Sequence, residues 1–183
     1  TTLAINLAYA FAGSVKVAIV DTDAQGSVSD LSDYLEGLDV VDLDRLLSGK
    51  LPEYDLVIVD TPPYLSSRLS ELFAISDFVL VPTKAGILDV MAIRATIALL
   101  KQSMSLKPTL KAGIVLNMIL ARTSLNEEVK EILSGYGIPL LSSAVSQRVS
   151  YTRSPVTKSV FGSDDNKAKE EIATLASEIL DTI

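Results

Sequence analysis

Short apolar runs alternate with amphipathic stretches along the chain. The apolar runs, which we predict to be buried strands, cover residues 15–20, 56–59, 78–81, 112–116 and 139–143. Apolar residues at helical spacing predict helices over residues 3–12, 42–47, 66–75, 88–103, 124–134 and 167–182. This alternation indicates parallel crossovers, so we predict an α/β fold: a doubly wound, mostly parallel sheet with helices on both faces. Residues 145–163 are polar and irregular, and Pro155 and Gly162 oppose a helix there.

Charge is unevenly distributed along the sequence. The chain has 183 residues, 48% of them hydrophobic, and a net charge of −7. This size favours a single domain over residues 1–183. Residues 1–89 carry 14 acidic and 5 basic side chains, whereas residues 90–163 carry 3 acidic and 9 basic ones. The basic block is therefore the part of the sequence where we expect nucleic acid to dock.

Several classes of protein are excluded by residue types that the sequence lacks. Without cysteine it forms no disulfide and no thiolate metal site, and without histidine it has neither a Ser-His-Asp triad nor a zinc-hydrolase centre. No apolar run has membrane-spanning length, and the polar face of the C-terminal helix is acidic, which disfavours binding to a membrane surface. We therefore expect a cytoplasmic protein without a membrane partner.

Carboxylates follow two of the predicted strands. Asp60 comes directly after the apolar run Leu-Val-Ile-Val, and Asp21 and Asp23 follow the run that ends at Val20. A carboxylate is costly at such a place unless it is solvated, paired or bound to a metal. Asp60 has the pattern of a Walker B aspartate that holds magnesium, and Asp23 could orient an attacking water. Turn capping is the alternative role for each, but two strands that both end in Asp-Thr favour chemistry.

The first two residues open an Ala- and Leu-rich helix. Thr1 and Thr2 are either ordinary capping residues or the end of a phosphate loop, in which a hydroxyl binds magnesium. The sequence contains no G-x-x-x-x-G-K-[ST] motif, so these residues alone leave both interpretations open.

Four ordered segments resemble the ParA-type partition ATPases, relatives of the septum-positioning ATPase MinD. The matching segments are residues 1–10 (TTLAINLAYA), 17–26 (VAIVDTDAQG), 56–63 (LVIVDTPP) and 81–89 (VPTKAGILD). Residues 146–155 and 159–161 resemble the small plasmid-type members. The resemblance covers nearly the whole chain and implies a P-loop NTPase-like domain that uses ATP or ADP and Mg²⁺.

The resemblance also implies roles for individual residues. Thr1 and Asp60 match the magnesium-binding hydroxyl and the Walker B aspartate of the family, and Asp21 would support the magnesium shell. Thr2 matches a phosphate contact, and Asp23 matches the aspartate that activates water.

Other parts of the family's nucleotide site are only partly present. Asn117 and Pro139 occupy the places where the family lines its adenine pocket. The family's first strand and phosphate loop, with its signature lysine, are not in the sequence, so we expect an N-terminally incomplete ParA-like domain. That strand lies beside the Walker B strand in such sheets, and without it the sheet would have a gap. A homologue that has lost its phosphate loop is the alternative.

The resemblance predicts an ATPase that partitions plasmid or chromosomal DNA. It implies a homodimer with nucleotide at the interface, non-specific DNA binding, association with the nucleoid, and a ParB-like centromere-binding adaptor that stimulates hydrolysis. Two alternatives remain. One is a non-catalytic ParA-like binding module, and the other is a related ATPase that positions another cargo, such as a cell-division site or a protein complex.

The predicted DNA contacts come from the basic block. Arg148, Arg153 and Lys158 lie in residues 132–163, a stretch without acidic residues, and we expect them to reach phosphates from a loop. In the alternative, Arg148 pairs with an acid inside the fold, and its loss would then lower the melting temperature. A second stretch without acids, residues 90–126, holds Arg94, Lys101, Lys107, Lys111 and Arg122.

Overall fold

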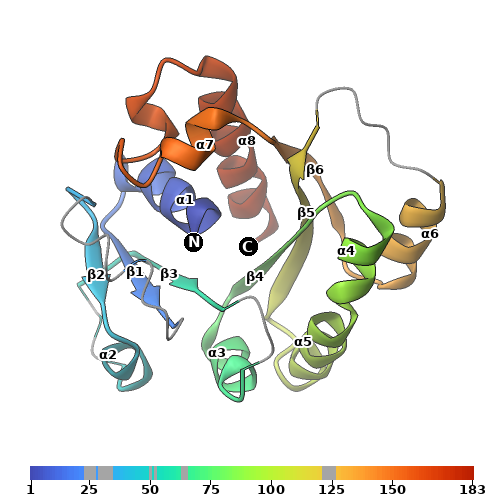
Figure 1. The fold of residues 1–183 in the computed structure, drawn as a ribbon. Coiled ribbons are helices and arrows are strands. Elements are labelled where there is room, and N and C mark those ends of the chain that lie inside the picture. The colour runs from blue at the N-terminus through green and yellow to red at the C-terminus, as the bar shows by residue number, and fades with distance from the viewer. Residues whose placement is uncertain (23–27, 29–34, 50, 52, 63–65, 121–126) are drawn as a thin grey trace. The chain divides into compact units, whose positions relative to one another are not determined.

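The computed structural model describes residues 1–22, 28, 35–49, 51, 53–62, 66–120 and 127–183 (Figure 1). The chain divides into two compact units, each built from two stretches of sequence. The first unit comprises residues 1–63 and 148–176, and the second comprises residues 64–147 and 177–183.

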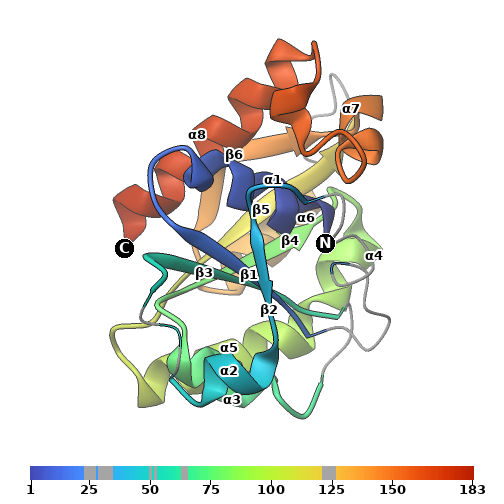
Figure 2. The ribbon, with the colours of Figure 1, turned by 90° about the vertical axis from the view of Figure 1, so that its left-hand side faces the viewer.

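The first unit contains a parallel sheet of three strands in the order β2-β1-β3 (Figure 2). Its elements are α1 (Thr2–Ala12), β1 (Val17–Asp21), β2 (Asp39–Val41), α2 (Leu43–Leu47), β3 (Leu56–Asp60), α7 (Val149–Arg153), the 3₁₀ turn η2 (Val160–Gly162) and most of α8 (Asn166–Thr182). In the register of β1 against β3, Asp21 pairs with Asp60. The two strand-end aspartates therefore lie side by side at the carboxyl ends of neighbouring strands.

Alternate residues of β1 face different helices, as the pleat of a strand requires. Val17 and Ile19 pack with Ile5 and Ala8 of α1 on one face of the sheet. On the other face, a second cluster packs against Leu43 and Leu46 of α2 and consists of Ala18, Val20, Val41 and Leu51. The sheet of this unit is thus covered on both faces (Figure 1).

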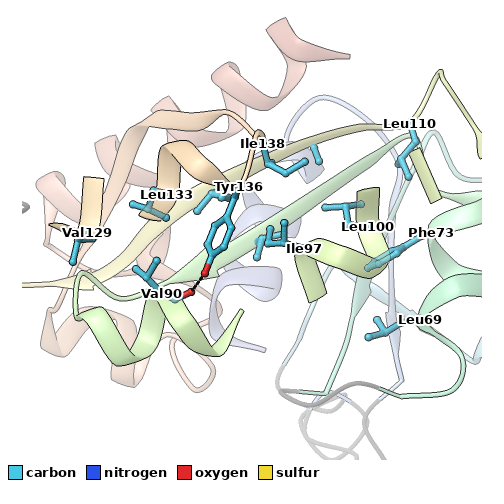
Figure 3. Packing of buried hydrophobic residues seen from close by; sticks show 13 residues of the cluster. Leu69, Phe73, Val90, Ile97, Leu100, Leu110, Val129, Leu133, Tyr136 and Ile138 are labelled. Carbon is cyan, nitrogen blue, oxygen red and sulfur yellow. Dashed lines mark hydrogen bonds between the residues drawn. The ribbon is translucent and has the colours of Figure 1, made fainter. Parts of the chain in front are cut away.

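The second unit contains a parallel sheet in the order β4-β5-β6. Its elements are α3 (Leu69–Ile75), β4 (Phe78–Thr83), α4 (Ile87–Ala92), α5 (Arg94–Leu106), β5 (Lys111–Ile119), α6 (Glu127–Gly135) and β6 (Leu140–Ser146). Side chains from all four helices meet the sheet in one apolar cluster (Figure 3). The hydroxyl of Tyr136 lies inside this cluster and donates to the carbonyl of Val90 at 2.6 Å, which satisfies a buried polar group.

The predicted fold class is confirmed. Within each sheet the strands are parallel, and helices connect strands that follow one another in the sequence. The helix predicted over residues 88–103 is instead two helices, α4 and α5, which meet at Ile93. The strand predicted to stop before Pro82 includes it. Among the described residues β4 is paired on one side only, and a strand in that position tolerates a missing N–H donor. The short strand β2 was not expected.

The region from 145 to 163 is more regular than its polar sequence indicates. Residues 149–153 form α7, which ends before Pro155, and residues 160–162 form η2. The expectation that Arg148 and Arg153 both lie in a loop is therefore wrong. Arg148 precedes the first turn of α7 in extended conformation, and Arg153 ends the helix, so helical geometry separates the two side chains.

Each three-stranded sheet has two outer strands among the described residues, and β3 and β4 are the more apolar of the four. Among the described residues, no strand pairs with the second side of β3 or of β4. Both strands are rich in apolar residues, a composition that is unusual for an unprotected sheet edge.

None of the described helices combines the length and the apolar character needed to span a bilayer.

Candidate nucleotide site

The structure brings Thr1 and Asp60 into direct contact. The hydroxyl of Thr1 donates to Oδ2 of Asp60 at 2.6 Å. Asp60 is 6% exposed, so its carboxylate is held in a mostly buried position. A hydroxyl and a carboxylate from residues 59 positions apart in sequence thus form one oxygen-rich pair.

The end of β3 is fixed by the end of β1. Both the backbone N–H and the hydroxyl of Thr22 donate to the carbonyl of Asp60, at 3.0 and 2.7 Å. Asp21 accepts a hydrogen bond from the backbone N–H of Val28 at 2.8 Å through Oδ2. The repeated Asp-Thr pattern therefore has a structural basis, because each copy ends a strand at the carboxyl edge, where ligand sites of parallel sheets lie.

The pair of Thr1 and Asp60 suits a hard divalent cation. Magnesium prefers oxygen ligands and commonly binds through one or two protein groups while it keeps several waters. The described residues contain no cluster of three or more His, Cys, Asp or Glu side chains. Thr2 is the first residue of α1, and Asp23 lies outside the described residues.

The two residues assigned to an adenine pocket lie at different levels of the second sheet. Asn117 is near the carboxyl end of β5, one residue beyond Leu116, which pairs with Ala144. Pro139 precedes β6, at its amino end, and its carbonyl accepts from the N–H of Ile114 at 2.8 Å. Pro139 lies beside Ile114, so three residues of extended β5, or ~10 Å, separate its level of the sheet from that of Asn117. Asn117 and Pro139 thus lie on β5 and at the start of neighbouring β6.

Arg148 is engaged inside the first unit. Its Nε and Nη2 atoms lie 3.2 and 3.1 Å from Oε1 of Glu171, and Nη1 lies 3.6 Å from Oδ1 of Asp165. The other oxygen of Glu171 lies 2.9 Å from the hydroxyl of Tyr151, whose pKa is raised by burial and by that carboxylate. Hydrogen bonding to Glu171 likewise raises the pKa of Arg148. These contacts correspond to the internal ion pair that the sequence left as an alternative.

The other two predicted DNA contacts are exposed. Arg153 ends α7 with its side chain in solvent, and Lys158 pairs with Glu36, although half of the lysine side chain remains exposed. Of the three predicted cations, Arg153 is thus exposed, and Lys158 is half-exposed beside its partner Glu36.

One residue that the sequence did not single out is fully buried among these elements. Asn6 lies on α1 and bonds to residues 154 and 160, far away in the sequence. A polar residue of low helix propensity inside an Ala- and Leu-rich helix was the available signal.

The parallel strands, the intervening helices, and the hydroxyl and carboxylate at the strand ends are the features of a nucleotide-binding α/β domain of the P-loop NTPase type. Residues 1–161 match the model of the CobQ/CobB/MinD/ParA nucleotide binding domain. The chain belongs to this family.

Two curated relatives match most of the chain. A maintenance of carboxysome distribution protein A from Halothiobacillus neapolitanus is 28% identical and matches over 98% of this chain and 90% of its own length. A ParA family protein from Mycoplasma pneumoniae is 25% identical over 78% of this chain and 56% of its own length.

Solved structures show the same fold at lower identity. The cell division protein MinD of Aquifex aeolicus has a TM-score of 0.74 and 15% identity over 100% of this chain and 92% of its own. An ATP complex of Cyanothece McdA has a TM-score of 0.70 and 14% identity over 100% and 91%. A putative plasmid partition protein of Borrelia burgdorferi, bound to AMPPNP, has a TM-score of 0.67 and 20% identity over 98% and 90%.

Proposed function

We propose that the chain is the catalytic domain of an ATPase that positions a cargo in the cell. The observation that carries the proposal is the contact between the Thr1 hydroxyl and the buried carboxylate of Asp60. In phosphoryl-transfer sites of the P-loop type, a hydroxyl at the start of the first helix and an aspartate at the end of a neighbouring strand hold the metal. Both the residue types and their placement here fit that arrangement.

Each strand-end residue has a separate task in this proposal. Thr1 and Asp60 hold Mg²⁺, Asp21 supports the shell around it, and Thr2 contacts phosphate. Asp23 accepts a hydrogen bond from the attacking water and orients it toward the γ-phosphate. When bound, Mg²⁺ neutralises the charge that develops on the phosphate oxygens.

A phosphate loop and its strand complete the site in this proposal. The free side of β3 supports this, since a parallel strand added there would cover an apolar edge next to Asp60. The domain would then be larger than residues 1–183, as the sequence led us to expect.

Two cargoes are supported by different observations. DNA partition is supported by the exposed side chain of Arg153, by the half-exposed Lys158 and by the likeness in fold to a putative plasmid partition protein. A large protein assembly as the cargo is supported by the likeness to the carboxysome distribution protein, which covers nearly the full length of both chains. In both cases we propose a homodimer with nucleotide at its interface that binds DNA non-specifically, associates with the nucleoid and responds to an adaptor on the cargo. For a DNA cargo, this adaptor is a ParB-like protein.

Turnover of magnesium-ATP tests the proposal. We expect the protein with a G-x-x-x-x-G-K segment ahead of Thr1 to hydrolyse ATP, and the 183-residue chain to bind ATP weakly. Asp60→Asn should weaken magnesium-dependent binding because it removes a ligand charge. Asp39→Asn, a matched change at the amino end of β2 in the same sheet, should leave binding and turnover unchanged.

Two outcomes count against this function. If the 183 residues alone bind magnesium-ATP at micromolar affinity, the phosphate loop is not needed. If the extended protein binds DNA but hydrolyses no ATP under any condition, the non-catalytic binding module is the correct interpretation.

A further inference from the structure

A single buried side chain connects α1 to the segment between α7 and η2. Asn6 is 0% exposed, and its Nδ2 donates to the carbonyl of Thr2 at 2.7 Å and to the hydroxyl of Ser154 at 2.8 Å. Its Oδ1 accepts the backbone N–H of Val160 at 2.8 Å. Both amide donors and the carbonyl oxygen of this side chain are therefore used. A buried amide is tolerated only when it is bonded in this way.

The segment that Asn6 holds is strained. Lys158 and Ser159 have φ angles of 64° and 131°, which non-glycine residues rarely adopt. The turn is also tight, since a Cβ on Gly162 would lie 2.4 Å from the carbonyl of Thr157. Inside it, the hydroxyl of Ser159 accepts the N–H of Phe161 at 3.1 Å. Such strain persists only where the surrounding structure over-determines the conformation.

The attachment points of Asn6 lie on either side of this strained pair. Ser154 precedes it and Val160 follows it, and both are fully buried. The hydroxyl of Ser154 also links Asn6 to α7, because it accepts a hydrogen bond from Asn6 and donates one to the carbonyl of Tyr151 at 2.9 Å. One amide therefore fixes both ends of the turn that carries Lys158, and also the end of α7.

We propose that Asn6 is a positioning residue for the DNA-contact segment. By fixing residues 154 and 160, it holds Arg153 and Lys158 in the arrangement that meets phosphates. Asn6 also bonds to Thr2, the neighbour of Thr1, so the segment is attached to the helix that begins at the proposed magnesium site. This inference rests on the proposed DNA binding for its biological consequence, but not for the positioning itself.

Hydrogen exchange tests the positioning without DNA. In the full-length protein, Asn6→Ala removes the acceptor of the Val160 N–H, so we expect this amide to exchange about tenfold faster, as the loss of a hydrogen bond to a buried group implies. Ser154→Ala, which leaves α1 intact, should speed exchange in residues 154–160 to a smaller extent. Ile5→Val is the matched control, because it removes apolar contact from the same helix but leaves the three hydrogen bonds in place.

DNA binding tests the consequence. Affinity for two unrelated duplexes is measured against salt for the parent, Asn6→Ala, Arg153→Ala and the double variant. Loss of one phosphate contact flattens the log–log salt slope by about 0.9. If Asn6 acts through Arg153, the two single changes flatten the slope alike and the double variant flattens it no further. Melting temperature should instead fall additively, because Arg153 is exposed.

Hydrogen exchange and DNA affinity together separate the positioning role of Asn6 from the proposed DNA-binding function. Faster exchange at Val160 in a protein that binds no DNA in any form supports the positioning and refutes the DNA-binding function. Unchanged exchange in Asn6→Ala, or exchange that rises equally throughout the first unit, overturns the positioning role. Additive losses of DNA affinity in the double variant overturn the action through Arg153.

Discussion

Arg148→Ala separates an internal role of this arginine from a role in DNA binding. The substitution leaves Glu171 without two charged donors, at 3.2 and 3.1 Å, and removes a weaker partner of Asp165. Hydrogen bonds to charged groups contribute about 1.5–3 kcal/mol. The side chains of Arg148 and Glu171 are 26% and 17% exposed, so screening by water reduces this contribution toward the value of about 0.2–1 kcal/mol found for exposed pairs.

The free energy of unfolding should therefore fall by about 1.5 kcal/mol, between these two limits. For a chain of this length, that corresponds to a fall in melting temperature of about 3–6 °C. Thermal unfolding of a double-mutant cycle with Glu171→Gln isolates the pair, and we expect a coupling energy of about 1 kcal/mol. Arg153→Ala is the control, because an exposed side chain should change stability by less than about 0.5 kcal/mol.

The same variants decide between the two roles when DNA affinity is measured. If Arg148 is internal, its loss lowers the melting temperature while the salt dependence of DNA binding stays that of the parent. A parental melting temperature, together with a salt slope flattened by about 0.9, would refute the structural argument and restore Arg148 as a phosphate contact.

Three further predictions concern other parts of the molecule. Burial raises the pKa of Glu178, but donors on Ser143 and Ser142 outweigh it and lower the pKa to about 2 from an ordinary value of 4.5. This stabilisation is complete above pH 4.5 and is lost as the pH falls toward 2, so the melting temperature of Glu178→Gln should depend less on pH in that window than the parent's. A Cβ on Gly113 would lie 2.8 Å from Leu141 Cδ2, so Gly113→Ala should cost about 1–3 kcal/mol in denaturant unfolding, and Leu141→Val should restore part of it. Asp23→Ala should keep nucleotide binding but abolish most single-turnover hydrolysis, and a parental rate would remove its assigned role.

Strand positions followed from the sequence because they depend on local composition. The runs that end at Asp21 and Asp60 are apolar on both faces, as buried parallel strands must be, and the alternation with helices determines the crossovers. The ends of helices and strands followed less closely from the sequence, because they depend on contacts beyond local composition. The break between α4 and α5 at Ile93 has no glycine or proline to mark it, and Pro82, which we expected to end a strand, lies within β4.

The candidate site was predictable only as far as short sequence patterns reach. Thr1 and Asp60 each belong to a recognisable segment, and the fold brings them within hydrogen-bonding distance. The partners of Arg148 lie 17 and 23 positions further along, on or beside α8, where no local pattern identifies them. An acid-free stretch of sequence therefore says little about whether its cations are free, because folding supplies acids from elsewhere.

In the first unit, helix α1 connects the proposed magnesium site to the segment that carries the exposed cations. Thr1 bonds to Asp60 at the start of α1, and one turn further on Asn6 bonds to the segment that follows Arg153. Helix α1 is rigid over this distance, since its residues are hydrogen-bonded in regular succession and packed on β1. A change at Thr1 that tilts this helix would therefore move the attachment of the cationic segment as well. Because linkage between binding sites is reciprocal, DNA bound at Arg153 should in turn alter magnesium-nucleotide affinity, by the same factor with which nucleotide alters DNA affinity.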